Sequence, residues 1–215
     1  MGSGQINLRT LLWVLGLIIP VEAAVIWLAS PRTGWYLLYL GLARLIEAAG
    51  ILLLLVRSGP GLSAVGLSGN RLARGFRTGL IWSACFCLAA AAGLFFLNMA
   101  GLNPRVFFQV PFPKTFAGVL LYFLVGGLVS PVTEELFFRG VLYGFFRRWG
   151  ATAALVASTA AFVLVHTPQI RWPVTQLVGG IVFALSYEVS KSLAVPITVH
   201  ILGNLGIFSL ALYFR

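Results

Sequence analysis

Two adjacent glutamates and two histidines are the residues of this chain best suited to hydrolytic chemistry. Glu134 and Glu135 are its only neighbouring pair of glutamates, and His166 and His200 are its only histidines. All four lie within apolar stretches, where an ionisable side chain is costly unless it is paired or faces a wet cavity. Each of them is therefore a candidate functional residue.

The glutamate pair stands in the stretch "EELFFR". Glu135 and Arg139 are four residues apart with the acid first, which is the favourable order for an ion pair on one helix face. Glu134 projects about 100° around the helix from Glu135 and has no partner nearby in the sequence. A purely structural ion pair explains Glu135 and Arg139, but it leaves Glu134 as a candidate general base.

The two histidines stand in the stretches "FVLVH" and "HILGN". Phe162 lies one turn before His166, and His200 and Asn204 are four residues apart, so they share a helix face. An imidazole and an amide on one face can donate hydrogen bonds jointly to an anionic oxygen. The structural alternatives are an interfacial histidine at position 166 and hydrogen bonds between helices at positions 200 and 204.

Composition places these residues in a membrane. The chain is 60% hydrophobic and 9% charged over 215 residues, whereas a soluble domain carries about 25% charged residues. Its net charge of +10 comes from 15 Lys and Arg against 5 acidic residues. Because most cations lie between apolar runs, they indicate membrane topology beside anionic headgroups, and no nucleic-acid partner is expected. The sequence predicts a multi-pass protein of the cell membrane.

The apolar runs predict an all-α, polytopic transmembrane helix bundle with about seven or eight helices and a catalytic cavity within the membrane. Residues 1–215 are expected to form one integral membrane domain, with less distinctive helices over 1–114 and a catalytic core over 115–210. The second half of the connection 57–77 is expected to lie along the membrane interface. The predicted spans are about 10–30, 34–56, 77–101, 116–148, 151–167, 174–190 and 193–213.

Depth along the helices predicts that the candidate residues meet. Glu134 lies 15 residues before Trp149, and His166 lies 17 residues after it. At ~1.5 Å per residue, both rise ~20–25 Å from the same turn. His200 lies nine residues beyond Lys191, or ~14 Å into the membrane by the same rise. The three side chains are therefore expected to share one buried pocket.

The remaining buried charges favour structural roles. Arg44 and Glu47 are three residues apart and predict an internal ion pair. Glu188 precedes Lys191 by three residues at the expected interface. Glu22 has no partner that the sequence identifies, and it too is assigned a structural role.

The three motifs resemble those of a known family. "EELFFR", "FVLVH" and "HILGN" are similar, in this order, to the EExxxR, FxxxH and HxxxN motifs of the CAAX protease and bacteriocin-processing family, also called the Abi family. That family includes the type II CAAX prenyl endopeptidases. The resemblance covers roughly residues 115–210 and implies a glutamate-type intramembrane endopeptidase.

The resemblance also implies roles for the catalytic residues. Glu134 would activate a water molecule that His166 helps to hold. His200 and Asn204 would form the oxyanion hole, and no covalent intermediate would arise. The supporting residues would be Glu135, Arg139 and Phe162.

The expected partners are a membrane-anchored protein or peptide substrate, cleaved near its C-terminus, and the lipid bilayer. No cofactor is implied. A zinc-dependent membrane protease is the alternative mechanism, since two histidines and a glutamate can bind zinc, although no HExxH stretch occurs. A non-proteolytic scaffold, immunity-type protein or transporter is the alternative function. The substrate and the membrane face to which the site opens stay undecided at this point.

Overall fold

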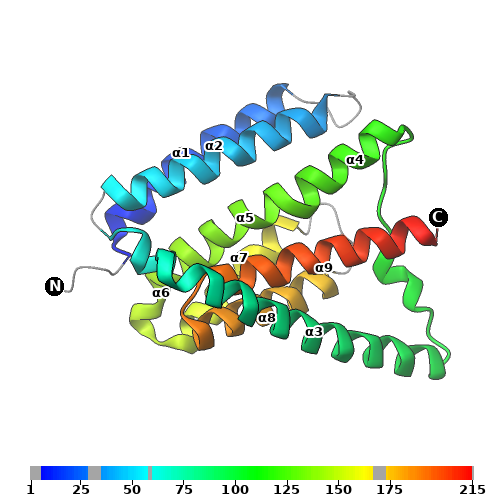
Figure 1. The fold of residues 1–215 in the computed structure, drawn as a ribbon. Helices are drawn as coiled ribbons and strands as arrows, with labels where there is room; N and C mark the ends of the chain where they lie inside the picture. Colours follow the sequence, from blue (N-terminus) through cyan, green and yellow to red (C-terminus); the bar gives the residue numbers. More distant parts are fainter. Residues whose placement is uncertain (1–5, 29–34, 58–59, 167–172, 215) are drawn as a thin grey trace.

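Helices joined by turns make up the part of the chain that the structure describes. The computed structural model describes residues 6–28, 35–57, 60–166 and 173–214, and no strand occurs within them. The predicted all-α class is therefore confirmed. Figure 1 shows the helices α1 (Leu8–Leu28), α2 (Tyr36–Arg57), α3 (Gly69–Met99), α7 (Ala151–His166), α8 (Val174–Ser190) and α9 (Ala194–Tyr213).

One further helical stretch, residues 116–149, carries the glutamate pair and changes its winding along its length. Pro131 lacks a backbone N–H and Gly126 and Gly127 add flexibility, so the regular hydrogen-bond ladder is interrupted here. Glu134 and Glu135 end a short α-helical piece that lies between two π-helical ones. The pieces are α4 (Phe116–Leu124), η3 (Val125–Val129), α5 (Ser130–Glu135), η4 (Leu136–Tyr143), α6 (Gly144–Phe146) and η5 (Arg147–Trp149).

Length and hydropathy make this a multi-pass membrane protein. Among the described residues, five helical stretches are long and apolar enough to cross a membrane, namely α1, α2, most of α3, residues 116–149 and α9. Two shorter apolar helices, α7 and α8, accompany them. Large apolar side chains such as Phe95 and Phe96 on α3 are exposed, as expected where a helix faces lipid.

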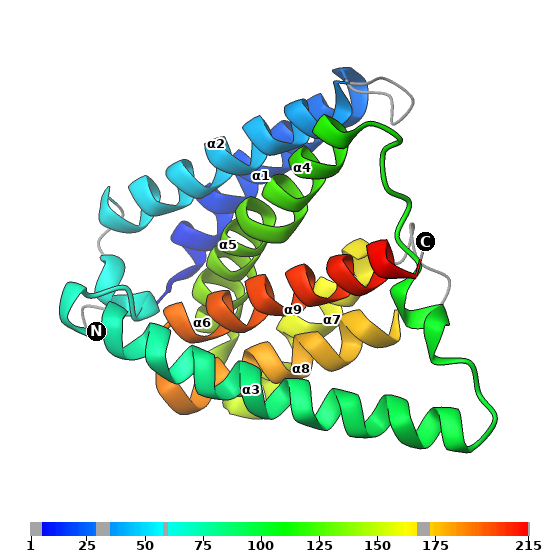
Figure 2. The ribbon, with the colours of Figure 1, turned by 45° about the vertical axis from the view of Figure 1, so that its right-hand side comes forward.

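The helices form two groups on either side of the 116–149 stretch. α1 and α2 make a hairpin that lies along α4 and α5, while α7, α8 and α9 pack on the other side (Figures 1 and 2). α3 runs beside α9. Gly79 permits this close approach, because a Cβ atom there would lie 2.6 Å from Cβ of Thr198. The 116–149 stretch therefore packs against helices from both halves of the chain.

The connection 57–77 differs from its prediction. A 3-10 turn, η1 (Leu62–Val65), is followed by α3, which already begins at Gly69. Residues 69–77 are thus continuous with α3, which was predicted to begin at about residue 77, and their position at the membrane interface stays a prediction. Gly75 explains the difference, because its missing side chain lets this part of α3 pack directly on Ser192 and Ala194.

Candidate active site

Three helices bring Glu134, His166 and His200 together. Glu134 lies near the end of α5, His166 is the last residue of α7, and His200 lies one and a half turns into α9. Oε2 of Glu134 is 3.9 Å from Nε2 of His166 and 3.8 Å from Nε2 of His200. The side chains thus converge as their depths along the helices predicted.

Glu135 links this cluster to a fully buried ion pair. Its Oε1 accepts hydrogen bonds of 2.8 Å from Nη1 of Arg139 and 2.8 Å from Nδ1 of His200. The side chains of Glu135 and Arg139 have no exposed surface. Nη2 of Arg139 also donates to the Gly180 carbonyl oxygen at 3.1 Å. The predicted Glu135–Arg139 pair is present, and it orients the ring of His200 through Glu135.

Aromatic rings surround the buried guanidinium group. Cζ of Arg139 lies 4.8 Å from the ring centre of Phe162 and 5.2 Å from that of Phe183. Such cation–π contacts favour the charge of the guanidinium group in apolar surroundings. Phe183 also stacks on His200 with 4.4 Å between the ring centres, and the ring centres of Phe162 and His166 are 4.6 Å apart. Phe183 could not be singled out from the sequence, because a phenylalanine in an apolar helix is ordinary.

The hydrogen bonds of the two histidines define which ring nitrogen carries a proton. Nδ1 of His166 lies 2.7 Å from the Phe162 carbonyl oxygen, which can only accept, so Nδ1 donates. Nδ1 of His200 likewise donates to Glu135, whose carboxylate is paired with Arg139. In the neutral state, Nε2 of each ring therefore presents a lone pair to the space beside Glu134.

Asn204 lies outside this hydrogen-bonded cluster. It shares a face of α9 with His200, but its Nδ2 donates to the Gly126 carbonyl oxygen at 2.9 Å. One amide N–H is thus used to join α9 to the π-helical piece η3. The role of Asn204 in an oxyanion hole stays a prediction.

Exposure differs sharply within the cluster. The side chains of Glu135 and Arg139 are inaccessible, whereas that of Glu134 is 15% exposed and that of His166 is 25% exposed. Glu134 is therefore the carboxylate of the pair that a substrate and a water molecule can reach.

No cation-binding group is formed by the described residues. No three of their His, Cys, Asp and Glu side chains are arranged to hold a metal ion. The expectation of a metal-free site stays a prediction.

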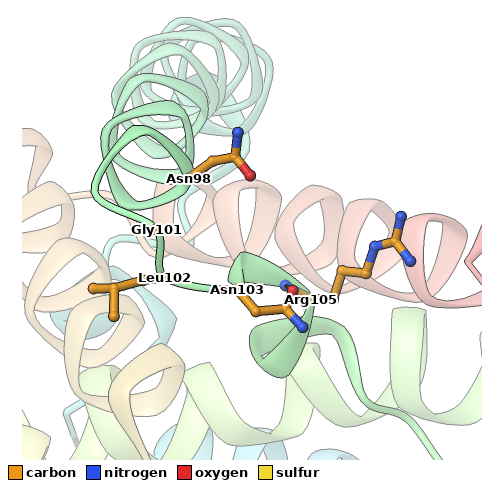
Figure 3. A pocket seen from close by; sticks show the side chains of 5 residues that line it. All are labelled: Asn98, Gly101, Leu102, Asn103 and Arg105. Atoms are coloured by element: carbon orange, nitrogen blue, oxygen red, sulfur yellow. Dashed lines mark hydrogen bonds between the residues drawn. The ribbon is translucent and has the colours of Figure 1, made fainter.

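Two hollows lie away from the cluster and contain none of the motif residues. One, with a cavity volume of about 370 Å³, lies at the loop after α3 and is lined by Asn98, Gly101, Leu102, Asn103 and Arg105 (Figure 3). The other, of about 400 Å³, is an apolar groove between α3 and α9, where Phe76 and Ile201 are among the lining residues.

The remaining three glutamates, Glu22, Glu47 and Glu188, are also paired. Nη1 of Arg44 bonds to Glu47 at 2.7 Å, as predicted, and also to Glu22 on α1. The sequence could not identify this partner of Glu22, because the two residues are far apart along the chain. At the other end of the 116–149 stretch, Glu188 pairs with Lys191 at 2.6 Å and with Arg147 at 2.8 Å.

Comparison with known families agrees with the motifs. Residues 116–206, which contain all three motifs, match the family model described as "Type II CAAX prenyl endopeptidase Rce1-like". The family resemblance is thus confirmed for this segment, and the match supports a CAAX-type intramembrane protease, and hence a hydrolase, in general. The search of curated proteins and the search of solved structures found no match.

Proposed function

We propose that this protein is a glutamate-type intramembrane endopeptidase of the cell membrane. It hydrolyses a peptide bond near the C-terminus of a membrane-associated or lipidated protein or peptide. The observation that carries this proposal is the position of Glu134, an accessible carboxylate 3.9 and 3.8 Å from two imidazole nitrogens. These separations are too long for direct hydrogen bonds and suit a water molecule in contact with all three groups.

In the proposed reaction, Glu134 removes a proton from this water as its oxygen attacks the scissile carbonyl carbon. His166 accepts the other O–H of the water at its Nε2 lone pair, which orients the attacking oxygen. Glu134 then passes its proton to the amide nitrogen, and the C–N bond breaks to give a carboxylic acid and an amine. No bond forms between the substrate and the protein.

His200 and Asn204 are proposed to stabilise the oxyanion of the tetrahedral intermediate. Because Nδ1 of His200 already donates to Glu135, its Nε2 can donate only when the ring carries both protons. Asn204 keeps a second amide N–H beyond the one that bonds Gly126, and this second N–H can donate to the same oxygen.

The test is a cleavage assay with purified protein in liposomes. The substrates are membrane-embedded peptides with a fluorophore near the C-terminus, prepared with and without a prenylated cysteine. Wild type is compared with Glu134→Gln, Glu134→Ala and His166→Ala, and Glu188→Gln is the matched control. We expect cleavage by wild type and the control only. Equal cleavage by the Glu134 variants shows that the catalytic assignment is wrong, and no cleavage by wild type favours a non-proteolytic membrane factor.

The same assay separates the proposed metal-free mechanism from a zinc-dependent one. Both histidines make hydrogen bonds through Nδ1 and leave Nε2 to hold a water molecule, but the same bonds would orient the rings towards a zinc ion, so the chelator decides between the mechanisms. We expect full activity after treatment with a strong chelator. Loss of cleavage that returns on adding zinc would instead establish a metalloprotease.

A further inference from the structure

A second cluster of buried charges lies in the N-terminal hairpin, outside the segment that matches the family. Arg44 of α2 bonds Glu47 on the same helix and Glu22 on α1. The side chain of Glu47 is 1% exposed and that of Arg44 is 19% exposed. Ionised groups at such positions in a membrane are costly and point to a function. This cluster, Glu22, Arg44 and Glu47, is called the hairpin triad below.

The backbone of the triad is attached to the helical stretch 116–149, called the catalytic helix below because it carries the proposed base, one residue before Glu134. The hydroxyl of Thr133, a buried residue, lies 2.9 Å from the Arg44 carbonyl oxygen and 3.2 Å from the Val129 carbonyl oxygen of its own helix, so the Arg44 oxygen is the nearer of its two acceptors. One turn earlier in α2, a Cβ atom on Gly41 would lie 2.9 Å from Cγ2 of Val125. The two helices thus touch closely one turn from this hydrogen bond, so the position of Arg44 is tied to that of Glu134.

The charged side chains of the triad also lie close enough to Glu134 to interact with its carboxylate. Both Arg44 and Glu47 interact electrostatically with its carboxylate. Such interactions are strong where water is scarce, because the effective dielectric constant is low. The charged and titratable groups that face Glu134 are Glu135 and Arg139 of its own helical stretch, His166 of α7, His200 of α9, and Arg44 and Glu47 of α2.

We propose that the hairpin triad is a positioning element for Glu134, which fixes its helix through Thr133 and sets the charge around its carboxylate. This inference rests on the proposed role of Glu134 as the general base. Glu22 and Glu47 hold Arg44 in place and offset its charge. The N-terminal hairpin therefore takes part in the reaction through Glu134 without touching the substrate.

Charge-changing variants test the electrostatic part of this inference through the pH dependence of kcat/KM. Glu47→Gln removes a negative charge near Glu134, so the acid limb of the kcat/KM profile should move to lower pH. Arg44→Gln removes a positive charge near Glu134, so the acid limb of the same profile should move to higher pH. Each shift is expected to be about half a pH unit or more, and the double variant should lie close to wild type.

Matched controls come from the ion pair between Arg147, at the far end of the 116–149 stretch, and Glu188 of α8. Arg147→Gln and Glu188→Gln make the same changes in an ion pair that lies away from the site. Their profiles should coincide with that of wild type. A purely structural triad predicts losses of activity without opposite shifts of the acid limb.

Variants of Thr133 test the positional part of the inference, in which the Thr133 hydroxyl fixes the helix that carries Glu134. Thr133→Val keeps the shape of the side chain and removes the hydroxyl that bonds Arg44. We expect kcat to fall about tenfold with little change in KM, because Glu134 is misplaced while substrate contacts remain. Thr133→Ser restores the hydroxyl and should recover most of the activity.

The outcomes separate the two proposals. If wild type does not cleave, or Glu134→Gln cleaves as well as wild type, the proposed function fails. If cleavage depends on Glu134 but the acid limbs of Glu47→Gln and Arg44→Gln coincide with wild type or move in the same direction, the triad inference is overturned. If Arg44→Gln does not fold, the triad inference is decided by Glu47→Gln together with Thr133→Val and Thr133→Ser.

Discussion

The 116–149 stretch and the N-terminal hairpin each hold an arginine that is paired with a buried glutamate. On the catalytic helix Arg139 pairs with Glu135, and in the hairpin Arg44 pairs with Glu47. Both of these glutamates are inaccessible to solvent. In both places the arginine offsets a carboxylate that would otherwise be buried alone at a large cost in free energy.

The two regions differ in what surrounds the second carboxylate. In the hairpin the second carboxylate, Glu22, bonds the same arginine. On the catalytic helix the second carboxylate, Glu134, faces two histidines, and no arginine or lysine lies within ion-pair distance of it among the described residues. A carboxylate that is not held by a cation can exchange a proton with water, so the difference supports the proposed base chemistry of Glu134 and the proposed positioning role of the hairpin triad.

The largest expected effect concerns these second carboxylates. Glu134→Gln should reduce kcat by about 10²- to 10⁴-fold, the range typical of general acid–base catalysis. Glu22→Gln should reduce it by no more than about tenfold, since Glu22 acts only through Arg44. Liposome cleavage rates measured well above the acid limb provide the check, and losses of equal size would erase the distinction between the regions.

The next effect is one that the two regions share. Arg139→Gln and Arg44→Gln each leave a buried glutamate without its cation, which costs about 3–5 kcal/mol of folding stability. Thermal unfolding in detergent should show a lower Tm for both variants. An unchanged Tm for Arg44→Gln would mean that the hairpin triad is not tightly held.

Docking of the hairpin on the catalytic helix can be loosened at Gly41. Gly41→Ala places a methyl group 2.9 Å from Val125, and overpacking of this kind costs about 1–3 kcal/mol. Gly93→Ala on α3 is the matched control, because a Cβ atom there meets nothing within 4 Å. Denaturation in detergent should show a loss of stability for Gly41→Ala alone, and cleavage should weaken with it if the hairpin positions Glu134.

The smallest effect is expected at the exposed end of the catalytic helix. Arg147 is 45% exposed in its pair with Glu188, and water and salt screen such a pair. Arg147→Gln should therefore leave the Tm within about 2 °C of wild type. A much larger fall would show that this ion pair joins α8 to the catalytic helix more firmly than its exposure suggests.

Much of the fold could be predicted from hydropathy and spacing. In lipid every backbone polar group needs an internal partner, so each apolar run had to become a helix, and the described helices lie close to the predicted spans. The start of α3 at Gly69 was missed, because Gly75 reads as a helix breaker in isolation. Its close contact with Ser192 and Ala194 becomes visible only when the helices are packed.

The candidate site was predictable to a similar degree. A separation of four residues fixes which side chains share a helix face, so the Glu135–Arg139 pair followed from the sequence alone. Spacing could not reveal that Asn204 bonds Gly126 or that Phe183 stacks on His200. These contacts depend on how two helices are rotated about their axes, which local sequence does not encode.

The sequence by itself determined the membrane class, the three motifs and the depth at which Glu134, His166 and His200 lie. Composition and helical rise are local properties, and they need no knowledge of neighbouring helices. Only the tertiary structure decided that Glu22 bonds Arg44 and that the Arg44 carbonyl holds Thr133. Those contacts join segments far apart in the chain, and they form because buried charges and hydroxyl groups must find partners wherever packing brings them.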